Sequence, residues 1–79
     1  MRLDKYLKVA RIIKRRTIAN EACDAGRVIV NDKVAKASLD VKVGDNIQLN
    51  LGNNTIKIRV LAVRDVIKKE EASTLYERL

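Results

Sequence analysis

The sequence predicts a single α+β domain in which two N-terminal helices pack on a small, mostly antiparallel sheet of about four short strands. The apolar residues recur with a period of about 3.6 before Gly26 and of about 2 after it, a change from helix to strand. The 79 residues leave room for only one small core. We expect the domain to cover residues 1–64 and a short helical tail to cover 65–79.

The first helix is predicted by an apolar stripe near the N-terminus. The side chains that recur at helical spacing and would face the core are Leu3, Tyr6, Leu7, Ala10 and Ile13. The opposite half of the helix would carry Arg2, Lys5, Lys8 and Arg11. The helix should therefore have one apolar and one basic face.

A second helix is expected between Thr17, which resembles an N-cap, and Gly26, a common residue at helix ends. Its buried face would consist of Ile18, Ala22 and Ala25. Cys23 is the single cysteine of the chain. In this small-residue pattern we expect it to be a buried core thiol and not a reactive one.

Short strands with alternating apolar residues follow the second helix. The first two flank Asn31–Asp32, residues that tolerate the positive φ of a tight hairpin turn. Two more are expected over 47–51 and 56–60, on either side of a turn at 52–54. Residues 68–79 carry charges of both signs and are expected to be helical.

Positive charge is concentrated at the N-terminal end of the chain. The net charge is +7 and the isoelectric point is near 9.9. Residues 1–16 contribute +6 of this total, with Asp4 as their only acid. The bases of this segment are Arg2, Lys5, Lys8, Arg11, Lys14, Arg15 and Arg16. Such an excess indicates an acidic polymer as partner, most often nucleic acid.

Three consecutive bases, Lys14, Arg15 and Arg16, directly precede the expected start of the second helix. A basic helix is often only a solvated surface. Here the basic face lies opposite the core stripe and continues into this triplet, where free N–H groups of a helix N-terminus can bind an anion. Guanidinium groups and backbone donors would together hold a phosphate, which favours RNA or DNA binding.

The composition disfavours an enzyme. The chain has no histidine, which excludes Ser-His and Cys-His catalysis and histidine-bound metals. Its three glycines are isolated, so no glycine-rich phosphate loop is present. We expect no catalytic residue, no metal and no cofactor.

No apolar run approaches the roughly 18 residues that a membrane span needs, and charges interrupt the N-terminus where a signal peptide would lie. A lone cysteine suits a reducing compartment. We therefore expect a cytoplasmic protein without a membrane partner.

The aromatic residues limit the mode of RNA recognition. Only Tyr6 and Tyr76 are present, and Tyr6 belongs to the core stripe. A platform on which several bases stack is therefore disfavoured, because such platforms are built from aromatic side chains. Recognition should rely on phosphates, 2′-hydroxyls and the shape of folded RNA.

Four segments resemble the S-four (S4) RNA-binding domain, also called the alpha-L motif. They are "RLDKYL" at 2–7, "KRRTIANEA" at 14–22, "GRVIVNDKVAKAS" at 26–38 and "VGDNIQL" at 43–49. Asp32 stands where the family usually has glycine. The N-terminal segment and the tail "KKEEASTLYERL" are most similar to the RqcP group, a stand-alone branch related to the small ribosome-associated heat-shock protein.

The resemblance implies a role in ribosome-associated quality control. From this resemblance we expect the chain to bind obstructed large ribosomal subunits at large-subunit rRNA and P-site peptidyl-tRNA. It would also support RqcH in adding C-terminal alanine tails to stalled chains. The positions that match the RNA-contacting motif are Arg2, Lys5, Arg15, Arg16 and Thr17. Lys8, Arg11 and Lys14 would extend this face. Asp4 also matches, and we expect it to orient a neighbouring arginine through a salt bridge.

Two other functions are compatible with the residues. The chain could be a general chaperone for structured RNA or DNA that acts away from the ribosome. It could also be a basic adaptor that docks an acidic protein. In each case we expect a monomer.

Overall fold

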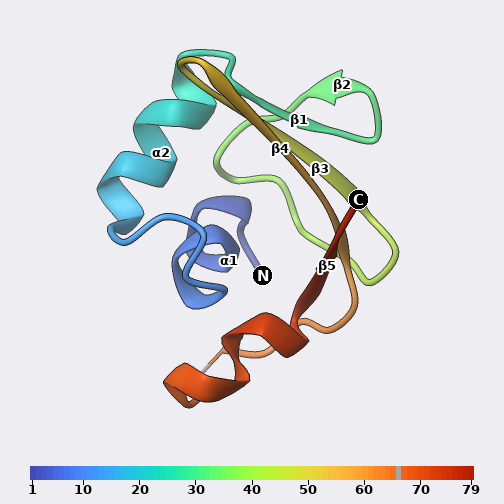
Figure 1. The fold of residues 1–79 in the computed structure, drawn as a ribbon. Helices are drawn as coiled ribbons and strands as arrows, with labels where there is room; N and C mark the ends of the chain where they lie inside the picture. Colours follow the sequence, from blue (N-terminus) through green and yellow to red (C-terminus); the bar gives the residue numbers. More distant parts are fainter. Residues whose placement is uncertain (66) are drawn as a thin grey trace.

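The computed structural model describes residues 1–65 and 67–79, and in these ranges two α-helices lie on one side of a five-stranded antiparallel sheet (Figure 1). The helices are α1 (Leu3–Val9), α2 (Arg16–Asp24) and the 3-10 helix η1 (Lys69–Thr74), and the strands are β1 (Val28–Val30), β2 (Lys33–Val34), β3 (Asn46–Leu51), β4 (Asn54–Val60) and β5 (Tyr76–Arg78). The predicted α+β class is confirmed.

The strands follow the order β2-β1-β3-β4-β5, and all neighbours are antiparallel. Between β1 and β2, Asn31 and Asp32 have φ values of 51° and 68°. This is the tight hairpin turn that the sequence predicted, since the primed turns require positive φ at both central residues. A second two-residue turn at Gly52 and Asn53 joins β3 to β4.

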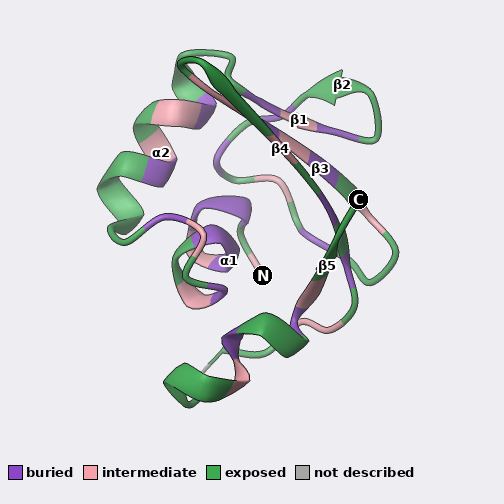
Figure 2. Cartoon of the chain, viewed as in Figure 1, coloured by how far each residue is buried: buried purple, intermediate pink, exposed green. Residues whose placement is uncertain are grey.

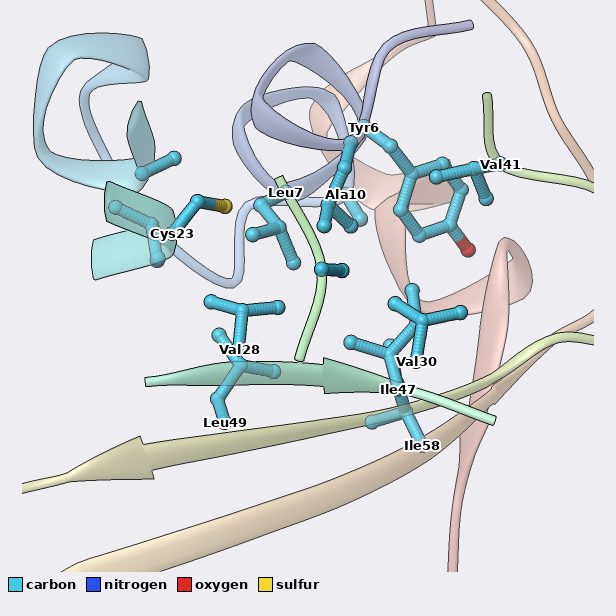
Figure 3. Close-up of a cluster of buried hydrophobic side chains, with 14 of the residues drawn as sticks. Tyr6, Leu7, Ala10, Cys23, Val28, Val30, Val41, Ile47, Leu49 and Ile58 are labelled. Carbon is cyan, nitrogen blue, oxygen red and sulfur yellow. The ribbon is translucent and has the colours of Figure 1, made fainter. Parts of the chain in front are cut away.

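The core lies between α1 and the inner face of the sheet. Figure 3 shows Tyr6 and Leu7 of α1, and Ala10 directly after it, projecting toward the strands. The strand side chains that meet them are Val28, Val30, Ile47, Leu49 and Ile58. Figure 2 shows exposed residues alternating with buried ones along α2, and the N-terminal part of β4 as mostly exposed. The predicted core stripe, including Ile13, is confirmed as buried.

Tyr6 connects α1 to the C-terminal segment. Its hydroxyl donates a hydrogen bond to the Leu75 carbonyl oxygen at 2.8 Å, although the ring is completely buried. Burial, with a smaller effect of Tyr76, raises the pKa of Tyr6 well above its usual range. The residue is a core anchor and does not offer its ring to an RNA base.

Helix α1 is shorter than the apolar stripe suggested. It ends at Val9, and Arg11 adopts a left-handed conformation with φ of 59°. The N–H groups of Ile12 and Ile13 both donate to the Leu7 carbonyl, at 3.1 and 3.2 Å. Ile13 therefore reaches the core through a turn, and Arg11 belongs to the interhelical loop and not to the helix face.

The predicted cap of α2 was wrong, and of its predicted buried face only Ala22 packs against the core, where it is half-buried. Arg15 is the N-cap residue, no side chain caps the helix, and Thr17 lies within its first turn. Ala19 and Cys23 are the buried residues, whereas Ile18 is 48% exposed and Ala25 is also exposed. Helix α2 is rotated about its axis relative to the predicted orientation, because Arg16 and Asn20 on α2 both reach Asp4 on α1.

The buried state of Cys23 agrees with its predicted role as a core thiol. Figure 3 shows its sulfur directed toward α1. Burial, together with the nearby charges of Asp4 and Asp24, raises the pKa of the thiol to about 11. At neutral pH the side chain is a protonated, unreactive thiol.

The C-terminal tail is only partly helical. The 3-10 helix η1 covers Lys69–Thr74, and β5 then pairs with β4, with Val60 opposite Tyr76. This fifth strand was not among the strands predicted from the sequence. Residue 66 of the predicted tail lies outside the described residues.

Candidate nucleic-acid interface

The seven bases of the N-terminal segment form what we call the basic surface. Arg2 precedes α1, Lys5 and Lys8 lie on α1, and the interhelical loop carries Arg11 and Lys14. Arg15 and Arg16 form the start of α2, followed by the exposed Thr17. All these side chains are exposed except that of Lys5, which is half-buried. The residues predicted from the sequence thus lie on two adjoining helices and their loop.

A buried carboxylate brings two of these arginines together. Asp4 is only 2% exposed, and Arg2 donates to its two oxygens from Nε and Nη2, both at 3.3 Å. Arg16 Nε lies 3.4 Å from Oδ2 of the same carboxylate. Two residues that are 14 positions apart are therefore held on one charged group.

Two neutral donors complete the Asp4 site. The Lys5 backbone N–H donates to Oδ1 at 2.7 Å, and the Asn20 side-chain amide donates to Oδ2 at 3.2 Å. Burial by itself raises the pKa of Asp4, but the hydrogen bonds from Asn20, Arg16, Lys5 and Arg2 outweigh it and lower the pKa below its ordinary value. Asp4 is consequently a carboxylate at neutral pH.

The arrangement leaves both guanidinium groups open to a ligand. The Arg2 and Arg16 side chains are 51% and 46% exposed, although each is held by Asp4. A guanidinium has five N–H donors, so those not directed at Asp4 remain available to phosphate oxygens. The fixed orientation reduces the rotamer freedom that these arginines would lose on binding.

Asn20 was not predicted as a site residue. Its spacing from Arg16 places both on one face of α2, because side chains four residues apart are neighbours on a helix. The sequence alone could not reveal their shared acceptor, since Asp4 lies on another helix. Asn20 is therefore a support for the arginine pair that only the packing of α1 on α2 reveals.

Lys5 has a partner from the C-terminal half of the chain. Its Nζ lies 3.1 Å from Oδ1 of Asp65, whose side chain is 74% exposed. A surface ion pair of this kind contributes about 0–1 kcal/mol to stability. The contact reduces the charge that Lys5 offers to a ligand, and it places Asp65 beside α1.

The start of α2 adds backbone donors to the basic surface. No side chain caps this end, and the first N–H bonded within the helix is that of Ala19, which donates to the Arg15 carbonyl. The preceding N–H groups can therefore serve an anion, aided by the helix dipole. Lys14, Arg15 and Arg16 flank these N–H groups. The sequence predicted this combination of bases and backbone donors as a phosphate site.

In the described part of the chain, no group of three or more acidic or cysteine side chains is placed to hold a metal ion. Within this described part, no helix is both long enough and apolar enough to cross a membrane.

Comparison with known proteins places this site in a family. The model of the S4 domain matches residues 1–47, the part of the chain that holds α1, α2 and the Asp4 site. The chain therefore belongs to the S4 domain family. The resemblance inferred from the sequence motifs is confirmed.

Two curated relatives are similar over nearly the whole chain. The RQC P-site tRNA stabilizing factor of Streptococcus pneumoniae is 53% identical over 77 residues, which cover 98% of this chain and 88% of the relative. The protein of the same name from Bacillus subtilis is 50% identical over 76 residues, which cover 96% and 88%.

A solved structure has the same fold. Vibrio cholerae heat shock protein 15, described as trimeric, superposes with a TM-score of 0.93 and 34% sequence identity. The superposition covers 100% of this chain and 81% of that protein.

Proposed function

We propose that this chain is an RNA-binding, cytoplasmic factor of ribosome-associated quality control without catalytic activity. It binds large-subunit rRNA and P-site peptidyl-tRNA on obstructed large ribosomal subunits. The observation that carries the proposal is the Asp4 site, which holds Arg2 and Arg16 in fixed, half-exposed positions. The name shared by the two curated relatives refers to stabilisation of P-site tRNA, and supports the same assignment.

The charge distribution supports contact through one side of the molecule. Residues 1–16 carry +6 of the net charge of +7, so the remainder of the chain is nearly neutral. Phosphate neutralisation supplies most of the affinity of such a surface and makes it dependent on salt. The oriented arginines add geometric selection, since a guanidinium fork matches a phosphate in only a few orientations.

The finer part of the proposal concerns the reaction that the factor assists. By holding the P-site tRNA, the chain would support RqcH in adding C-terminal alanine tails to stalled nascent chains. It would do so as a monomer, with rRNA and tRNA engaged by the same rigid domain. The test is a tailing reaction reconstituted with and without this protein. Alanine tails of equal length in both reactions would contradict this part.

A pull-down with and without nuclease separates the proposal from the two other functions. Recovery of large ribosomal subunits that depends on intact RNA is the expected result. Recovery of free RNA or DNA without ribosomal subunits would instead indicate a general chaperone. Capture of an acidic protein that survives nuclease treatment would indicate an adaptor.

A further inference from the structure

A cleft lies between the end of α1 with the interhelical loop and Ile67 with the start of η1. Its volume is 540 Å³, and its walls are formed by Lys8, Val9, Arg11 and Lys14 on one side and by Ile67 and Lys69 on the other. Ile67 and Lys69 lie outside the S4 domain match, which ends at residue 47. The cleft thus adds a C-terminal contribution to the basic surface.

The cleft is strongly cationic. Lys8, Arg11, Lys14 and Lys69 line it, and among the lining residues that the structure describes Asp65 is the one acid. The Asp65 carboxylate is paired with Lys5 at 3.1 Å, which offsets its charge. The four lining cations therefore favour a ligand that carries phosphate.

The cleft also has an apolar wall. Val9 and Ile67 are half-buried, pack against the core, and still line the cleft. A phosphate group alone gains nothing from aliphatic side chains. A nucleotide combines a phosphate with a base whose faces are largely apolar, and covering Val9 and Ile67 with such a face removes apolar surface from water.

Each wall is held by contacts within the protein. The Arg11 N–H donates to the Lys8 carbonyl at 3.0 Å, which helps to hold the loop in its left-handed turn. On the other side, the Lys5–Asp65 ion pair and the bond from the Tyr6 hydroxyl to Leu75 tie the C-terminal segment to α1. A preformed cleft loses little conformational freedom when it is filled.

We propose that this cleft holds one unpaired nucleotide of the bound RNA. The base packs between Val9 and Ile67, and the adjoining phosphates lie among Lys8, Arg11, Lys14 and Lys69. The inference rests on the proposed RNA binding and names the feature of the RNA that the chain selects. A base inside a regular duplex cannot enter the cleft, whereas a bulged nucleotide is already unstacked.

The test compares an RNA hairpin of regular duplex with the same hairpin carrying one bulged nucleotide. We expect the wild-type chain to bind the bulged RNA about fivefold to tenfold more tightly, which corresponds to about 1–1.4 kcal/mol. Ile67→Ala should remove this preference and leave duplex binding unchanged. Val34→Ala is the matched control, because Val34 is 67% exposed on β2 and does not line the cleft.

A second variant tests the phosphate contact without touching the core. Lys69→Ala changes an exposed residue, and we expect it to lower the salt slope of bulged-RNA binding by about 0.7–0.9, the value for one phosphate contact. Lys57→Ala removes the same charge from β4, where Lys57 lies on the opposite sheet face from the buried Ile58. This control should leave the slope unchanged.

The outcomes distinguish this inference from the proposed function. Equal affinity of the wild-type chain for both hairpins would overturn the nucleotide cleft and leave RNA binding intact. A preference for the bulge that survives Ile67→Ala would also overturn it, because the base would then be bound elsewhere. Absence of binding to either hairpin would contradict the proposed RNA binding itself.

Discussion

The substitution Asp4→Asn separates the orientation of the arginines from their charge as the source of RNA affinity. It keeps the shape of a buried side chain but removes the carboxylate that lies between Arg2 and Arg16. The net charge rises by one from +7, so an interface governed by charge alone would bind RNA more tightly. An interface that needs oriented guanidinium groups would bind RNA more weakly.

The contacts of Asp4 set the size of the expected effect. A hydrogen bond to a charged group contributes about 1.5–3 kcal/mol, and Asn20, the Lys5 backbone and Arg2 all donate to this carboxylate. Arg2 and Arg16 are half exposed, so water replaces much of what they lose. After this discount we expect the free energy of unfolding to fall by about 1.5–3 kcal/mol. RNA affinity should fall about tenfold, or about 1.4 kcal/mol.

The assay is a titration of structured RNA with each variant at fixed salt, next to a denaturant titration that reports folding. Asp24→Asn is the matched control, since it makes the same change of charge at an exposed position of α2. We expect the control to bind RNA at least as tightly as wild type. A folded Asp4→Asn variant with the affinity of the control would refute the orienting role of Asp4.

Salt, acid and thiol reagents each probe a different part of the structure. If about four to six phosphates are contacted, log K should fall against log salt with a slope of roughly −3 to −5, and a slope near zero would contradict the phosphate site. Arg16→Ala should weaken RNA binding by about 1.5–3 kcal/mol; loss of the fold at 25 °C would show a structural role instead. The folded-state pKa of Asp4 lies below its ordinary 3.8, so its stabilising effect is complete above that value and is lost as pH falls through the lower one. Unfolding free energy measured against pH should therefore fall more steeply in acid for wild type than for Asp4→Asn. Burial raises the pKa of Cys23 to about 11, so alkylation at neutral pH should require unfolding, and equal labelling of native and unfolded chains would contradict the buried thiol.

The features that could be predicted from the sequence are those that depend on near neighbours. The hairpin at Asn31–Asp32 is one, because two adjacent residues determine the turn and the alternating strands determine its register. The stripe of Leu3, Tyr6 and Leu7 is another, since helical spacing alone assigns it to the core. The concentration of bases in residues 1–16 also needed no structure to detect.

The features that escaped prediction depend on contacts between distant segments. The face that α2 buries depends on Asp4 of α1, because Arg16 and Asn20 turn toward this carboxylate. Hydrophobicity alone predicted that Ile18 is buried, whereas the structure buries Ala19. Strand β5 is three residues long, too short for an alternating pattern, and forms because the edge of β4 pairs with it. Lys69 lines the cleft because contacts between distant residues, Lys5 with Asp65 and Tyr6 with Leu75, hold the C-terminal segment near α1.

Co-sedimentation with two kinds of large ribosomal subunit tests the proposed function most directly. One preparation carries peptidyl-tRNA and the other is empty, at the same salt and over the same range of protein concentration. A rigid domain that engages rRNA and tRNA together makes its second contact intramolecularly, and one added charged hydrogen bond corresponds to about a tenfold to hundredfold gain in affinity. We predict that gain for the subunits that carry peptidyl-tRNA. Equal affinity for the two preparations would contradict a role at the P-site tRNA.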